Sequence, residues 1–124
     1  FALQLDDGRD LMLYRMRRDD GGTDPASAGT LVDREGAVEP LGADDIVFRA
    51  LDTWTSPATG VSYPLRWELR LPGHDLELLV TPAFEAQEMD VTVRYWEGAI
   101  TVQGEQAGSP VSGRGYMELA GYGD

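Results

Sequence analysis

Several residue types are absent from the chain or nearly so, and each absence removes a class of chemistry. The 124 residues include no cysteine and no lysine, and His74 is the only histidine. Without cysteine the chain forms no disulfide, thiolate zinc site or cysteine nucleophile. Without lysine it forms no Schiff base. A single histidine in a Pro-Gly turn provides neither the base of a Ser-His-Asp triad nor a multi-histidine metal site. We therefore expect neither a metal nor a cofactor.

Positive charge and long hydrophobic runs are also scarce. Ten basic residues stand against 22 acidic ones, which gives a formal net charge of −12. Nucleic acids and anionic membranes bind clustered positive charge, so we expect neither as a partner. No apolar run approaches the ~20 residues that a membrane-spanning helix requires. The hydrophobic fraction of 42% is nevertheless sufficient for a buried core, and the length is typical of one domain.

The dominant pattern is alternation of apolar and polar residues, which is typical of β-strands. The clearest case is 61–71, where one face carries only apolar side chains and the other face carries Arg66, Glu68 and Arg70. Asp7-Gly8 between two alternating runs predicts a β-hairpin. Residues 83–89 are the only candidate for a helical turn. The spacing predicts about nine strands, hence an all-β sandwich or an up-and-down barrel, and short connections favour the barrel.

Carboxylates among aromatic residues are the remaining candidates for chemistry. Glu118 lies between Tyr116 and Tyr122, and Glu97 follows Trp96. Because a strand alternates its faces, Glu97 points to solvent if Trp96 points to the core. The same reasoning leaves the face of Glu118 open, since both faces of the last strand are mixed. We take Glu118 as the first candidate acid and Glu97 as the second.

Large aromatic side chains on the predicted strands are candidates for the wall of a ligand cavity or, equally, for a filled core. An eight-to-ten-stranded barrel is just wide enough for either. On the second strand, Arg15 and Arg17 share a face with Leu11 and Leu13, so an arginine there could orient a polar ligand group. The candidate ligand-binding residues are Tyr14, Trp54, Tyr63, Trp67, Trp96 and Tyr116.

Several segments together resemble a known family. The segments are FALQLDDGRDLMLYRMR (1–17), GTLVDREG (29–36), DTWTSPATG (52–60), YPLRWELRLP (63–72), RYWEGAITVQG (94–104) and GRGYMELAGYG (113–123). In this order they resemble the lipocalin-like family of AttH proteins and carotenoid 1,2-hydratase (hydroxyneurosporene synthase), and within it the branch of predicted secreted hydrolases. The closing pair, RYWEG and GYMELAGY, is the most specific part.

The resemblance implies a lipocalin-like (calycin) antiparallel up-and-down β-barrel of about 8–10 strands over residues 1–124. It also implies that Phe1 begins the second barrel of a two-barrel bacterial protein. An upstream barrel of the same chain would then be its partner, and the location would be secreted or periplasmic.

Three functions fit these expectations. The first is a domain that binds an apolar molecule such as an isoprenoid or another lipid. The second is an enzyme that hydrates an isoprenoid double bond, or hydrolyses a lipid-like substrate, by carboxylate acid catalysis; hydration needs a carboxyl group kept protonated by apolar surroundings and aromatic faces near the carbocation. The third is a filled barrel that serves as a scaffold for the upstream domain. We favour binding, because active sites often lie between domains.

Overall fold

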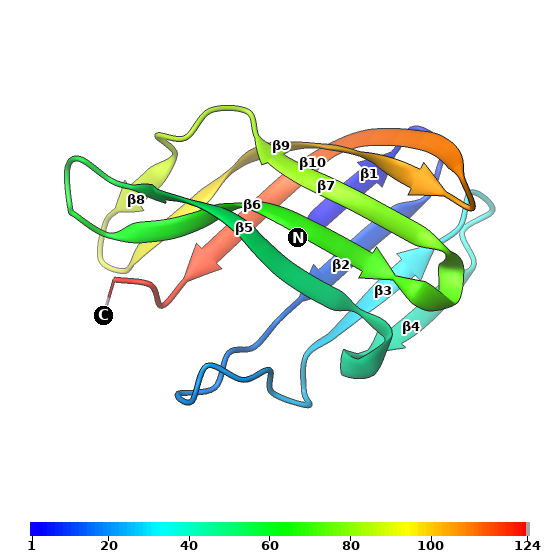
Figure 1. The fold of residues 1–124 in the computed structure, drawn as a ribbon, viewed down its shortest axis with the longest axis horizontal. Coiled ribbons are helices and arrows are strands. Elements are labelled where there is room, and N and C mark those ends of the chain that lie inside the picture. Colours follow the sequence, from blue (N-terminus) through cyan, green and yellow to red (C-terminus); the bar gives the residue numbers. More distant parts are fainter. Residues whose placement is uncertain (124) are drawn as a thin grey trace.

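The computed structural model describes residues 1–123, and the regular secondary structure there consists almost entirely of β-strands (Figure 1). The only helical elements there are two three-residue 3-10 turns, η1 (Ala43–Asp45) and η2 (Pro72–His74). The all-β prediction is therefore confirmed. The strands are β1 (Ala2–Leu5), β2 (Asp10–Tyr14), β3 (Ala28–Val32), β4 (Val38–Gly42), β5 (Val47–Thr55), β6 (Ser62–Leu71), β7 (Leu76–Pro82), β8 (Glu88–Asp90), β9 (Arg94–Gln106) and β10 (Ser109–Ala120).

All of these strands belong to one antiparallel sheet with the order β4-β3-β2-β1-β10-β9-β7-β6-β5, and β8 pairs with β9 beyond the end of β7. The sheet consists of two meanders, β1–β4 and β5–β10, that are joined where β1 pairs with β10. Neighbours in sequence are therefore neighbours in space within each meander, as the short connections predict.

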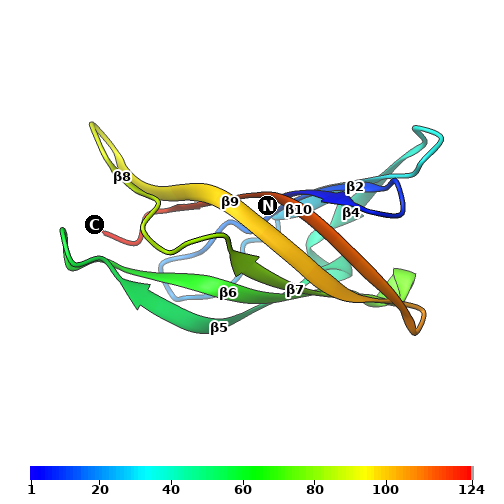
Figure 2. The same ribbon diagram turned by 90° about the horizontal axis from the view of Figure 1, so that it is seen from above.

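The two edge strands, β4 and β5, are consecutive in the chain. Only residues 43–46 connect them, and so short a segment spans at most about 18 Å. The sheet must therefore curl until its edges approach each other at this end. Figure 2 shows the result, a half-barrel in which β5 and β6 lie opposite β2 and β4 while β9 and β10 cross between them. This curled sheet agrees with the predicted lipocalin-like architecture.

The inside of the curl is filled with large side chains. Along β6 every second residue is buried, and Leu69 and Leu71 are completely inaccessible to solvent. Trp67 and Trp96 belong to the same core, with exposed fractions of 4% and 0%. Burying one such side chain stabilises the fold by roughly 1.5–3 kcal/mol. The predicted apolar face of 61–71 is therefore confirmed, and the core determines which way the sheet curls.

Glycines in β10 allow β1 to join the two meanders. A Cβ atom at Gly113 would lie 2.3 Å from the carbonyl oxygen of Gln4, and one at Gly115 would lie 2.1 Å from that of Ala2. Contacts this short are forbidden to any side chain. The backbone of β1 therefore approaches β10 at positions that only glycine tolerates.

The helical turn predicted over 83–89 is wrong. Glu88–Asp90 forms β8, and residues 83–87 have no regular structure. The open edge of β9 provides the reason: the side-chain amide of Gln87 accepts a hydrogen bond from the Ala99 N–H (2.9 Å) and donates one to its carbonyl (3.3 Å). A short helix is marginal in water, whereas pairing with this edge satisfies backbone groups that are otherwise unpaired.

Candidate functional site

A cleft of about 400 Å³ opens beside the first residues of β1, between the ends of β2 and β10. Ala2 pairs with Met12 of β2 and with Tyr116 of β10, and both neighbouring strands continue past this point. Side chains from β1, β2, β5, β6 and β10 therefore meet here. The residues that line it include Phe1, Tyr14, Arg15, Arg17, Phe48, Trp67, Tyr116, Glu118 and Tyr122.

The floor of the cleft is aromatic. The ring of Phe1 stacks on that of Phe48 (6.0 Å between centroids) and meets Trp67 edge to face (5.6 Å). Leu13 and Leu119, both buried, complete the apolar lining. Such aromatic pairs stabilise a cluster beyond the area that they bury. Because Phe1 and Phe48 are only partly buried, this edge of the core is accessible from the cleft.

Cations line one side of the cleft because the alternation of β2 continues beyond its end. Leu11 and Leu13 point into the core, and Arg15 and Arg17 follow on the same face. The Arg17 Cζ atom lies 3.7 Å from the centroid of the Tyr122 ring, which is a cation–π contact. Burial raises the pKa of the Tyr122 phenol, and the nearby charges of Arg17 and Arg15 oppose that increase.

The two candidate acids lie on the outer face of the sheet. Met117 and Leu119 are buried, so Glu118 points outward, where it is exposed at the rim of the cleft. Glu97 lies directly opposite Glu118 in the pairing of β9 with β10. The Tyr116 hydroxyl donates a hydrogen bond to Glu97 Oε1, and this bond is the main reason that the pKa of Tyr116 is raised to about 12.

The cleft brings together four of the eight residues selected from the sequence, namely Tyr14, Trp67, Tyr116 and Glu118. The other four lie elsewhere. Trp96 and Tyr63 are core residues, Trp54 stacks on Tyr63 (6.4 Å between centroids), and Glu97 lies beyond Tyr116 on the outer face. The catalytic roles of Glu118 and Glu97 stay predictions.

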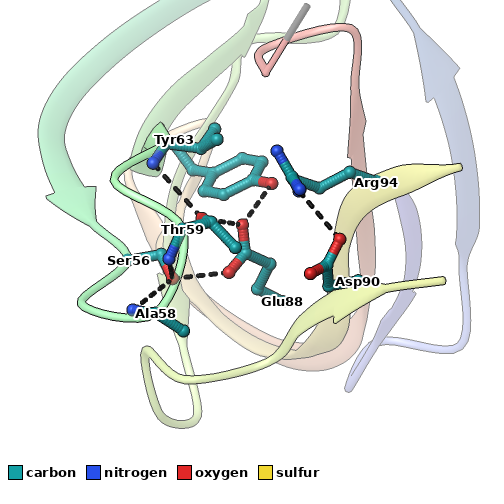
Figure 3. A network of polar contacts seen from close by, with 8 residues as sticks. Ser56, Ala58, Thr59, Tyr63, Glu88, Asp90 and Arg94 are labelled. Atoms are coloured by element: carbon teal, nitrogen blue, oxygen red, sulfur yellow. Dashed lines mark hydrogen bonds and ion pairs between the residues drawn. The ribbon is translucent and has the colours of Figure 1, made fainter.

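A second polar cluster was not predicted. Glu88 of β8 accepts hydrogen bonds from three hydroxyl groups, those of Ser56 (2.5 Å), Thr59 (2.7 Å) and Tyr63 (2.8 Å) (Figure 3). We call these four residues the Glu88 cluster. They join β8 to the loop between β5 and β6 and to the start of β6, segments that lie 25 to 32 residues apart in sequence.

Hydrogen bonding determines the protonation of the Glu88 cluster. Burial disfavours the charged form of Glu88, but the three hydroxyl donors outweigh this effect and lower its pKa. Burial, followed by the hydrogen bond to Glu88, raises the pKa of Tyr63 to about 12. The carboxylate is already used by these donors, so the cluster holds the end of the half-barrel together. The Thr-Ser-Pro-Ala-Thr segment (55–59) is the only sequence signal, because this composition is typical of a loop, and it does not indicate Glu88 as a partner.

Other site types receive no support from the described residues. Within residues 1–123, no three histidine or carboxylate side chains converge where they could hold a metal ion. None of the helical elements in that range has the length and hydropathy needed to cross a membrane.

The chain is similar to one sequence family and to a solved structure. No curated protein matches the chain. The crystal structure of a candidate AttH protein (NE1406) from Nitrosomonas europaea is similar, with a TM-score of 0.85 and 33% sequence identity. The similarity covers 99% of this chain but only 38% of that one. The family model described as AttH-like matches residues 1–122. The chain therefore belongs to the AttH-like family.

Proposed function

We propose that the chain binds an apolar, lipid-like small molecule in the cleft formed by Phe1, Phe48 and Trp67. The observation that supports this proposal is an aromatic floor that remains open to solvent at the edge of an otherwise filled half-barrel. A volume of about 400 Å³ lies within the range of small-molecule sites. Apolar ligands bind such a surface because their contact with water is lost.

The location of the cleft favours an open site over a closed cavity. The core residues fill the centre of the curl, so a ligand would lie against the core edge beside β1. A ligand there contacts rings on one side and polar groups at the rim on the other. This arrangement suits an amphiphile or one end of a long hydrocarbon.

Acid catalysis on a bound lipid is the second candidate function, because Glu118 lines the same cleft. Its carboxylate is exposed, whereas hydration of an alkene requires an acid in apolar surroundings. We therefore place binding first. Incubation of the protein with an acyclic isoprenoid, followed by mass analysis for addition of water, tests the second function; product formed by the wild type and lost in Glu118→Gln would place catalysis first.

Displacement of the neutral fluorescent probe N-phenyl-1-naphthylamine tests the binding site. Ala120 lines the cleft and is exposed, so Ala120→Trp fills the cleft without entering the core. We expect this variant to bind the probe at least about tenfold more weakly than the wild type, since the ring contacts become inaccessible. Ala50→Trp is the matched control, because Ala50 is exposed on β5 and lies outside the lining. Equal probe affinity in both variants would exclude this cleft.

A further inference from the structure

Two arginines at one side of the cleft have no acidic partner. Among residues 1–123, Arg15 and Arg17 form no ion pair, although the chain carries 22 acidic residues. Arg9, Arg49 and Arg94, in contrast, each contact a carboxylate at 2.5 to 2.9 Å. Within residues 1–123, no carboxylate therefore contacts the positive charge of Arg15 or Arg17.

Neutral groups hold both guanidinium groups in place. Arg17 donates to the carbonyl oxygens of Ala120 (2.8 Å) and Gly121 (2.9 Å), and it lies over the Tyr122 ring. Arg15 donates to Thr23 Oγ1 (2.9 Å) and to the carbonyl of Gly21 (3.3 Å). These bonds use only part of the five N–H donors that each guanidinium carries. The remaining donors are already oriented, which lowers the entropy lost when an anion binds.

We propose that the cleft recognises a long-chain monocarboxylate, with the carboxylate between Arg15 and Arg17 and the hydrocarbon chain against Phe1, Phe48 and Trp67. This inference rests on the proposed function and adds the chemistry of the ligand head group. Guanidinium groups match the geometry of a carboxylate, and the apolar floor begins directly beside them.

Charge selects a singly charged head group over a doubly charged one. The chain has a net charge of −12, and Glu118 lies at the rim of the same cleft. Both repel anions, and they repel a phosphate monoester more strongly than a carboxylate. Glu118 therefore restricts where the head group lies, and the arginine side of the cleft is the favourable position.

The experiment compares three ligands with the same hydrocarbon chain: dodecanoate, 1-dodecanol and dodecyl phosphate. Each displaces N-phenyl-1-naphthylamine from the wild type and from the double variant Arg15→Gln/Arg17→Gln. We expect the wild type to bind dodecanoate at least about tenfold more tightly than 1-dodecanol, and more tightly than dodecyl phosphate. In the double variant, the affinity for dodecanoate falls at least about tenfold while that for 1-dodecanol changes less than about twofold.

Matched variants separate the head-group effect from a change in structure. Arg34→Gln removes an exposed arginine outside the cleft, and it should leave all three affinities unchanged. Arg15→Lys/Arg17→Lys keeps the positive charge and should retain most of the preference for dodecanoate. This variant tests the inference in case the double glutamine variant is misfolded. Glu118→Gln should strengthen binding of dodecanoate severalfold, because it removes a negative charge from the rim of the cleft.

The outcomes distinguish the two proposals. Equal affinity of the wild type for dodecanoate and 1-dodecanol overturns the head-group inference but leaves the binding function intact. Tighter binding of dodecyl phosphate overturns the choice of a carboxylate. If none of the three ligands displaces the probe, the proposed function fails and the inference fails with it.

Discussion

The Glu88 cluster and the cleft beside β1 both combine charged groups with aromatic rings, but they use the charge differently. In the Glu88 cluster, one carboxylate receives three hydroxyl donors within 2.8 Å. In the cleft, two arginines are held by neutral groups and keep their charge unpaired. Satisfied polar groups stabilise a fold, whereas oriented but unpaired groups remain available to a ligand. Similar residue types therefore leave the charge fully hydrogen-bonded in one region and without a contacting counter-charge in the other.

Removing the Glu88 carboxylate should have the largest effect on stability. Glu88→Ala leaves the buried Ser56 and Tyr63 hydroxyls without their acceptor. We expect the free energy of unfolding to fall by about 3 kcal/mol, because each unsatisfied buried donor costs roughly 1–3 kcal/mol. Urea denaturation followed by circular dichroism measures the change. Glu85→Ala removes an exposed carboxylate from the same segment, and an equal loss in both variants would contradict a structural role for Glu88.

A side chain at Gly115 should disturb the junction that carries the cleft. The Cβ atom of Gly115→Ala would meet the Ala2 carbonyl oxygen, so β1 must move away from β10. We expect a loss of about 2 kcal/mol in the free energy of unfolding, as in overpacked cores, together with weaker probe binding. Gly73→Ala is the control, since a Cβ there meets nothing within 4 Å. Unchanged probe binding in a stable Gly115→Ala variant would separate the cleft from the position of β1.

Lowering the pH should remove the stabilisation that the ionised Glu88 carboxylate gives to the fold. Because the folded state lowers the pKa of Glu88, its ionisation stabilises the fold above the ordinary value of 4.5, and that contribution is lost as the pH falls through the lower folded value. The difference in unfolding free energy between the wild type and Glu88→Gln should therefore be constant above about pH 6 and should shrink below pH 4.5. If the difference in unfolding free energy instead grows as the pH falls, the folded state raises the pKa of Glu88 rather than lowering it.

Tyr63 adds an opposite dependence at high pH. Its pKa rises from 10.0 to about 12 in the folded state, so the contribution of the protonated phenol is complete below pH 10 and disappears as the pH approaches 12. Ultraviolet titration of phenolate absorbance measures this shift. In Glu88→Ala, the pKa of Tyr63 should move down toward 10.0 but stay above it, since burial is the larger cause.

A substitution on the outer face of the sheet should have the smallest effect on stability. Glu97→Gln removes the charged acceptor of Tyr116, so the pKa of Tyr116 should fall from about 12 toward 10.0. Stability should change by less than about 0.5 kcal/mol, because exposed pairs contribute little. The same ultraviolet titration, with Tyr63 as the internal reference, measures the shift. A pKa of Tyr116 that stays near 12 would show that another group causes it.

The sequence predicted the features that depend on alternation along one strand. The apolar face of 61–71 and the outward direction of Glu97 follow from the two-residue period, and the structure confirms both. The same period left Glu118 undecided, because the last strand carries mixed residues on each face. Only the packing of Met117 and Leu119 into the core decided it.

Features that depend on distant segments were beyond prediction from one sequence. The partners of Glu88 lie in the β5–β6 loop and at the start of β6, 25 to 32 residues earlier, and they meet only because these segments and β8 reach the same end of the half-barrel. The prediction of a helical turn over 83–89 was wrong for a related reason. Gln87 hydrogen-bonds to the free edge of β9, and Glu88 pairs with it as part of β8. The local sequence pattern of 83–89 does not indicate where the free edge of a distant strand lies.

Side-chain alternation alone determined that this chain is an all-β protein with one apolar face, because the pleat of a strand repeats every two residues. The curl of the sheet decided the rest. It turned Trp96 and Tyr63 into core residues, placed Glu118 at the surface, and brought Arg15 and Arg17 beside an aromatic floor made by Phe1 and by residues of β5 and β6. These relationships arise from the close contact of segments that are far apart in the chain, and only the tertiary structure contains them.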